Sequence, residues 1–208
     1  MARKIVPQRV EEVKKKIIQS SIELIIRNGF CQFTLKSVAQ RLGISKAAIY
    51  WYFPTKEELI KELSRDVRNK YIGSLQEISS ASLSPKQKLT SILARFESVE
   101  DELTCILPIK IFLECYTEKN DIQELIRQSY IEFTNIIENI LREGVDKGEF
   151  VIPGSTDAVA EFIVGAIDGI TLHGLITGKG GNSTSNIFIM RALEFLMTDK
   201  QGGEPFHE

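Results

Sequence analysis

The sequence has 208 residues, of which 43% are hydrophobic, and its formal net charge is -2. A chain of this size and composition can bury one sizeable core and a small second module, which excludes a disordered or fibrous protein. No apolar run approaches the roughly 20 residues that a bilayer span needs, and the N-terminal segment lacks a secretory apolar core, so we expect a cytoplasmic protein.

Two helices are predicted at the start of the chain. Apolar residues recur at helical spacing from Val10 to Ile25, and the pair Asn28-Gly29 tolerates the left-handed conformation that ends a helix. Thr34 is a candidate cap for the second helix, in which Leu35, Val38, Ala39 and Leu42 share one face. Gly43 closes this helix, whose apolar face is expected to pack on the first.

A short helix and a long connector helix are predicted next. Ser45 caps the short helix over Lys46–Tyr52, and Pro54 ends it. Thr55 and Glu58 then form a capping box that begins a polar helix over residues 55–78. We expect this helix to connect two parts of the chain.

The remaining chain is predicted to be helical as well. Residues 79–85 form a loop in which Ser84 caps the next helix and Pro85 takes its first position. Gly144 and Gly148 are expected to stop a later helix, and Pro108 is expected to begin or kink another. The predicted helices cover residues 89–99, 103–116, 122–141, 156–176 and 185–197. The sequence therefore predicts an all-α fold of about nine helices with no convincing strand.

Positive charge is concentrated at the N-terminal end. Residues 1–60 carry 11 Lys and Arg against 5 Asp and Glu, a net charge of +6, whereas residues 61–208 carry 15 against 23, a net charge of -8. A basic region of this kind favours contact with phosphates, although a solvated basic surface has the same composition. The motifs must distinguish the two.

The stretch TLKSVAQRLGISKAAIYWYFPTKEEL, residues 34–59, together with the preceding GF-x-x-F, closely resembles the DNA-binding domain of TetR-type transcriptional regulators. The resemblance is specific over about residues 10–60. It implies an all-α homodimer, usually a repressor, whose divergent C-terminal domain binds a small-molecule inducer. We therefore assign residues 1–54 to a helix-turn-helix domain and residues 55–208 to effector binding and dimerisation, with 55–78 as the connector helix.

The residues of the helix-turn-helix suit DNA contact. The second helix of such a unit presents its N-terminal residues to base edges while the first braces against the backbone. Ser45 and Lys46 offer donors, Ala47 allows close approach to a thymine methyl, and three consecutive aromatic residues cannot all be core. The resemblance implies that Thr34 bonds a phosphate, that Lys36 approaches the groove and that Lys56 contacts the DNA backbone. For Tyr52, packing against the first helix is an alternative to DNA contact. The predicted DNA-binding residues are Thr34, Lys36, Ser45, Lys46, Ala47, Tyr50, Trp51, Tyr52 and Lys56.

The effector site is harder to locate, because each candidate residue is also typical of an ordinary hydrophobic core. Aromatic residues on the middle helices are expected to wall an apolar cavity, with a few polar contacts. If Glu114 or Asp168 lies inside, a cationic lipophile fits; if both face solvent, a neutral or acyl ligand is equally suitable. The candidates are Phe96, Phe112, Cys115, Tyr116, Tyr130, Phe133, Phe162 and His173.

The two C-terminal helices are expected to form the homodimer interface. They are apolar around much of their circumference, and Gly165 and Gly169 lie one turn apart, which allows another helix to approach closely. Packing within one chain is the alternative.

Other functions remain open from the sequence. A basic helical module that binds acidic protein partners, a small enzyme using His173 or a cysteine, and a thiol-based redox sensor are the alternatives. Cys31, Cys105 and Cys115 show no CxxC spacing, and no triad, metal-ligand pattern or phosphate loop is present. We therefore expect no catalytic activity, no metal and no cofactor.

Overall fold

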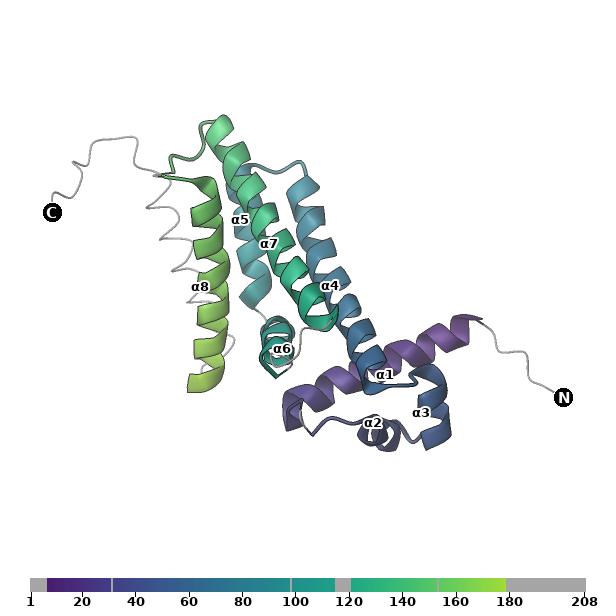
Figure 1. Ribbon diagram of the computed structural model, residues 1–208. Helices are drawn as coiled ribbons and strands as arrows, with labels where there is room; N and C mark the ends of the chain where they lie inside the picture. Colours follow the sequence, from purple (N-terminus) through teal and green to yellow (C-terminus); the bar gives the residue numbers. More distant parts are fainter. Residues whose placement is uncertain (1–6, 31, 98, 115–120, 153, 179–208) are drawn as a thin grey trace. The chain divides into compact units, whose positions relative to one another are not determined.

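The computed structural model describes residues 7–30, 32–97, 99–114, 121–152 and 154–178, and these residues are all-α (Figure 1). Within them the chain forms eight α-helices and one short 3₁₀ helix, and no strand. The elements are α1 (Pro7–Asn28), α2 (Leu35–Leu42), α3 (Lys46–Tyr52), α4 (Lys56–Ser80), α5 (Pro85–Ala94), η1 (Arg95–Glu97), α6 (Val99–Glu114), α7 (Asp121–Asp146) and α8 (Thr156–Thr177). The predicted helix over residues 185–197 lies outside the described residues.

The chain divides into two compact units. The first comprises the described residues up to Asn69 and those of Leu107–Ile126, and the second comprises Lys70–Ile106 and the described residues from Arg127 onward. This division differs from a single boundary after residue 54, because later segments pack with the first unit. Lys110 Nζ donates to the Ile25 carbonyl oxygen at 3.4 Å, and Lys61 is ion-paired with Asp121.

The first unit is built around side chains from α1 to α4. The helical spacing of apolar residues turns one face of each helix inward, as the sequence pattern predicts. Ile17 and Ile25 of α1 are completely buried, and so are Val38 of α2 and Ile49 of α3. The start of α4 completes this core with Leu59, Ile60 and Leu63.

The predicted helix caps at Thr34, Ser45 and Ser84 are confirmed. Thr34 and Ser45 have extended backbones and accept hydrogen bonds from the third backbone N–H of their helices. Ser84 does the same for α5, where Pro85 takes the first helical position. Gly43 ends α2 in the left-handed conformation, with φ of 65°. Side-chain caps satisfy backbone donors that have no partner inside the helix, so these residues fix where each helix begins.

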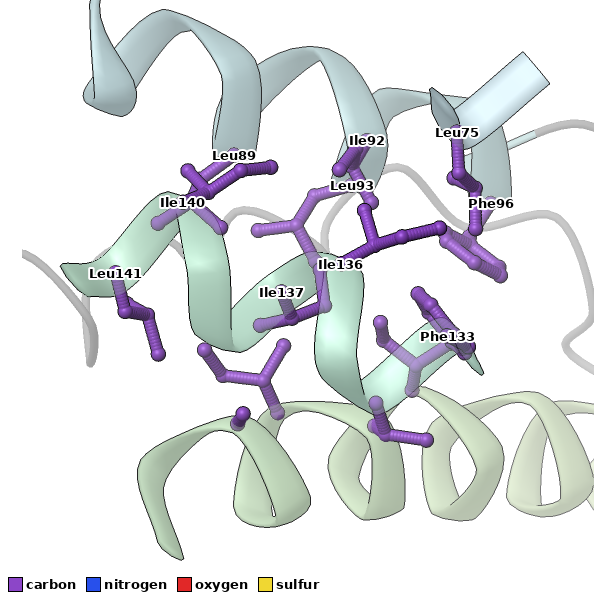
Figure 2. Close-up of a cluster of buried hydrophobic side chains, with 14 of the residues drawn as sticks. Leu75, Leu89, Ile92, Leu93, Phe96, Phe133, Ile136, Ile137, Ile140 and Leu141 are labelled. Atoms are coloured by element: carbon purple, nitrogen blue, oxygen red, sulfur yellow. The ribbon is translucent and has the colours of Figure 1, made fainter. Parts of the chain in front are cut away.

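The second unit has its own hydrophobic core. Figure 2 shows the inward side chains of α7, among them Ile137 and Ile140, between Leu89 and Leu93 of α5 and the ribbon of α8. The core continues into α8 through Ile163 and Ile167. Lys88 is only 6% exposed, and its ammonium donates to a Glu143 oxygen at 2.8 Å. The pKa of Glu143 is held below its ordinary value by its hydrogen bonds to Lys147 and Lys88.

Two predicted helix boundaries in the second half are wrong. Val99 begins α6 instead of closing the preceding helix, because η1 separates the two. Pro108 lies inside α6, which is one of the two positions predicted for it. Gly144 does not stop α7, which continues to Asp146. The ring of Phe150 packs against Gly144 so closely that an added Cβ would lie 2.0 Å from it. This glycine is needed for space, and Gly148, with φ of 71°, takes the left-handed conformation beyond the helix end.

None of the described helices is both long and apolar enough to cross a membrane.

Candidate nucleic-acid interface

The start of α2 is held by a reciprocal pair of hydrogen bonds. The Thr34 hydroxyl accepts from the Ser37 backbone N–H at 3.1 Å, and the Ser37 hydroxyl accepts from the Thr34 N–H at 3.2 Å. The Ser37 hydroxyl also donates to the Thr34 carbonyl oxygen at 2.7 Å. The sequence analysis missed Ser37, because this position of a capping box normally carries Glu or Gln. Thr34 and Lys36 are both exposed, so the beginning of α2 presents a hydroxyl and an ammonium to solvent.

The turn between α2 and α3 depends on Gly43. Its N–H bonds the carbonyl oxygens of Ala39 and Gln40, and its positive φ is a conformation that favours glycine. The chain then reverses into the Ser45 cap of α3 within two residues. An ion pair between Arg41 and Glu23 ties α2 to α1 beside this turn. The angle between α2 and α3 is therefore set by local backbone geometry.

Helix α3 exposes one face and buries the other. Ile49 is completely buried and anchors the helix on the first unit's core. Lys46 and Ala47 are exposed at the N-terminal end, and Tyr50 and Trp51 are 42% and 58% exposed. Two large aromatic side chains exposed side by side form an apolar patch, which is often a binding surface. On α3 this patch lies next to Lys46 and Ala47. This surface offers stacking faces, donors and a close backbone approach.

The aromatic side chains of α3 do not share one environment. The Lys46 ammonium lies 5.7 Å from the centre of the Tyr50 ring, and the Trp51 ring packs edge-on against Tyr52 at 4.7 Å with an interplanar angle of 87°. Tyr52 is half-buried, so the Trp51 ring packs against a partly buried neighbour. Lys46, Ala47, Tyr50 and Trp51 form the exposed surface, which is called the α3 face below.

Lys56 is placed differently from the other predicted cations. Its ammonium donates to the Phe30 carbonyl oxygen at 3.1 Å and lies 4.2 Å from the centre of the Phe30 ring. The Phe33 ring is 5.5 Å away. The ammonium has three N–H donors, so a contact with the DNA backbone would use one that is not bonded to Phe30. The position of Lys56 ties the first turn of α4 to the segment between α1 and α2, which the sequence pattern does not reveal.

The predicted effector residues are dispersed over the structure. Phe96 and Phe133 are buried in the second unit with their rings stacked at 6.0 Å, and Tyr130 packs on the same core cluster. Phe112 is half-buried but belongs to the first unit. Cys115 and Tyr116 lie outside the described residues.

Two further effector candidates face outward on α8. Phe162 is 57% exposed and His173 is exposed as well, so neither lines an interior cavity of the described chain. Both lie on the helix face that Gly165 and Gly169 share, opposite the buried face of Ile163 and Ile167. Within the described ranges, no group of three or more His, Cys, Asp or Glu side chains is placed to hold a metal ion.

Comparisons with known proteins place these features in a common context. Residues 17–63 match the family described as "Bacterial regulatory proteins, tetR family", and residues 86–185 match the "Tetracyclin repressor-like, C-terminal domain". The fatty acid metabolism regulator protein of Bacillus subtilis is 24% identical over 156 residues, which cover 74% of this chain and 78% of the relative. The transcriptional repressor KstR2 of Mycolicibacterium smegmatis is 26% identical over 163 residues, which cover 76% and 77% of the two chains.

A solved structure shares the fold. The TetR-family transcriptional regulator from Agrobacterium tumefaciens superposes with a TM-score of 0.78 at 22% sequence identity. The match covers 91% of this chain and all of that one.

Proposed function

Because the chain belongs to the TetR family of bacterial regulatory proteins, we propose that it is a ligand-responsive repressor of transcription that leaves its operator when an effector binds. The observation that carries the proposal is the α3 face, which is exposed on a helix that the preceding helix and a glycine turn hold in a helix-turn-helix. The family consists of regulators rather than enzymes, and we infer no catalytic role for this chain. Its place of action is with the DNA in the cytoplasm.

The α3 face would enter the major groove. In a helix-turn-helix the N-terminal residues of the second helix reach the base edges. Lys46 can donate to guanine acceptors and Ala47 can contact a thymine methyl, while the Tyr50 hydroxyl serves phosphate or base. Thr34, at the start of the bracing helix, would donate to a phosphate through the hydroxyl that also caps α2. Ser45 acts mainly as a cap, because its oxygen accepts from Ala48 N–H at 3.1 Å.

A dimer would bind two half-sites related by two-fold symmetry. The exposed face of α8 carries three large apolar side chains, Phe162, Leu172 and Ile176, and Ile176 is 75% exposed. Among the described residues, no atom lies within 4 Å of a Cβ added at Gly165 or Gly169, which leaves room for a second helix to approach there. This face supports self-association through α8 and the C-terminal segment that follows it. A dimer of this kind reads a palindromic operator whose half-sites lie about one DNA turn, roughly 34 to 36 Å, apart.

The second unit would hold an apolar or amphipathic effector. Helices α4, α6 and α7 each contribute residues to both units, so a rearrangement in the second unit has three covalent routes into the first. The effector must bind one arrangement more tightly than the other, because equal affinity would shift nothing. Release then follows when the two copies of α3 no longer fit adjacent grooves together.

The experiment measures DNA binding against salt concentration. Fluorescence anisotropy with labelled random duplex should show log affinity falling linearly with log salt, because each bound phosphate releases counterions. Selection from a random pool should enrich a palindromic sequence. For that sequence we expect Lys46→Ala and Tyr50→Ala each to cost about 1 to 3 kcal/mol of binding free energy. Lys86→Ala, in the second unit, is the control and should leave the affinity unchanged.

The outcomes separate the candidate functions. A flat salt response would contradict DNA binding and favour the module that binds acidic proteins. Unchanged operator affinity in both α3 variants would show that another surface reads the DNA.

A further inference from the structure

Asp168 is a carboxylate in an apolar setting on α8. It lies on the flank between the buried and exposed faces of the helix, and the neighbouring Ile167 and Ile170 belong to or pack against the second unit's core. Its Oδ1 accepts a hydrogen bond from the Tyr130 hydroxyl at 3.4 Å. Burial raises the pKa of Asp168 to about 6, and the Tyr130 hydroxyl lowers it less than burial raises it.

No cation compensates this carboxylate within the described part of the chain. Among those residues, Tyr130 is the only side chain that interacts with Asp168, and no Lys, Arg or His is paired with it. Glu143 of the second unit, by contrast, is paired with Lys88 and Lys147. Partial burial of a carboxylate without a counterion is unfavourable. Packing of the core alone therefore gives no reason for an acidic residue at position 168.

An aromatic cluster lies beside this pair. The rings of Tyr71, Phe96 and Phe133 lie within 6.0 Å of one another, with Tyr71 edge-on to both phenylalanines. Tyr130 packs on the same core and joins the cluster to Asp168. Figure 2 shows the Phe96 and Phe133 side chains near each other at one end of the core. Aromatic rings attract cations through their negative faces.

We propose that the Tyr130–Asp168 pair receives the positively charged group of the effector, an amine or quaternary ammonium, while the apolar part of the effector packs against the aromatic cluster. This inference rests on the proposed function, since it takes the second unit to be the effector-binding part. A cationic ligand supplies the counterion that Asp168 lacks. A neutral ligand leaves the carboxylate uncompensated, and an anionic acyl ligand is repelled by it.

The test compares three probes that differ in charge and share a benzyl group. Benzyltrimethylammonium carries the cation, neopentylbenzene is its neutral carbon isostere, and phenylacetate is an anion. Calorimetric titration of the full chain is carried out with the wild type, Asp168→Asn and Glu161→Gln. Glu161 is an exposed carboxylate on the same helix, so Glu161→Gln is a matched control for the loss of one negative charge.

We expect the wild type to bind benzyltrimethylammonium more tightly than either other probe. Asp168→Asn should weaken cation binding by about tenfold or more, which is the loss of one charge-assisted contact of about 1.4 kcal/mol. Binding of neopentylbenzene should change by less than about twofold in the same variant, and Glu161→Gln should behave as the wild type. Tyr130→Phe should weaken cation binding less than Asp168→Asn does.

Three results would overturn the proposal. One is the absence of benzyltrimethylammonium binding by a folded wild type. Another is an equal loss of cation and neutral probe in Asp168→Asn. The third is unchanged cation binding in an Asp168→Asn variant that no longer dimerises, because the carboxylate would then serve a contact between copies. DNA binding is measured on separate, probe-free samples, so a failure of the proposed function is distinguishable from a failure of this site.

Discussion

The Lys56 ammonium lies 3.1 Å from the Phe30 carbonyl oxygen and 4.2 Å from the centre of the Phe30 ring. A single cation thus joins the first turn of α4 to the segment that leads from α1 to α2. Its position makes Lys56 a structural residue of the first unit, whatever further contact it makes with DNA. This distinction can be measured.

Replacing Lys56 should reduce stability. Lys56→Gln removes a charge-assisted hydrogen bond and a cation–π contact, and we expect a loss of about 1 to 2 kcal/mol in the free energy of unfolding, measured by urea titration with circular dichroism. Lys36→Gln, at an exposed lysine of α2, is the control and should change stability by less than about 0.5 kcal/mol. Equal stability of the two variants would show that the Phe30 contact contributes nothing.

The Thr34 and Ser37 hydroxyls allow capping to be separated from DNA contact. Thr34→Ala should cost about 1 kcal/mol of stability through the lost cap, and Ser37→Ala should cost less, because the Thr34 oxygen still accepts from the Ser37 N–H. If Thr34 also bonds a phosphate, operator affinity falls further in Thr34→Ala than its stability loss explains, while Thr34→Ser retains it. Parallel losses of operator affinity in Thr34→Ala and Ser37→Ala would assign Thr34 to capping alone.

The exposed face of α8 should control the oligomeric state. Phe162→Glu combined with Ile176→Glu places two charges where the proposed interface is apolar, and we expect the dimer dissociation constant to rise by about a hundredfold or more. Analytical ultracentrifugation gives this constant. Val145→Glu, at another exposed apolar position of the second unit, should leave it unchanged. A dimer that tolerates both α8 charges must associate through a different surface.

Gly144 provides a test of packing at the end of α7. An alanine Cβ would lie 2.0 Å from the Phe150 ring, so Gly144→Ala should lower the free energy of unfolding by about 1 to 3 kcal/mol. Gly73→Ala has open space around the new Cβ and should raise stability by about 0.5 to 1 kcal/mol through helix propensity. Replacing the ring with the smaller leucine side chain in Phe150→Leu should recover part of the stability that Gly144→Ala loses. Thermal unfolding followed by circular dichroism measures all three effects.

Asp168 makes stability depend on pH. Its pKa of about 6 in the folded chain is above the ordinary value of 3.8, so the folded state binds the proton more tightly than the unfolded state. The stability that this proton confers is present below about pH 4 and is lost as the pH rises through about 6. Asp168→Asn should therefore stabilise the chain by about 1 to 2 kcal/mol near pH 8, after allowance for the exposed part of the side chain, and by almost nothing near pH 4. A pH-independent difference would contradict the assignment.

Local features of the fold could be predicted from the sequence, because they depend on neighbouring residues. Thr34, Ser45 and Ser84 each cap the helix that they precede, and the capping signal lies within four residues. Gly144 shows the limit of that reasoning. A glycine that ends a helix and a glycine that admits an aromatic ring look the same in the sequence, and the ring of Phe150 decides between them.

The same limit applies to the candidate sites. The α3 face was predictable, because the motif and helical periodicity specify which side of a short helix is exposed. The Lys56–Phe30 contact joins residues 26 positions apart, and the Tyr130–Asp168 contact joins residues 38 apart. Contacts at such separations depend on tertiary packing. The sequence could therefore identify Asp168 as a candidate acid but could not predict its burial or its contact with Tyr130.

Trp51 is the only tryptophan of the chain, and it projects from α3 with 58% of its surface exposed. Its fluorescence therefore reports on α3, the proposed recognition helix, and Trp51 belongs to the first unit. Docking on DNA should quench or shift this emission without any label. In a melting experiment, emission follows the first unit whereas circular dichroism follows every helix, so a difference between the two curves would reveal units that unfold separately.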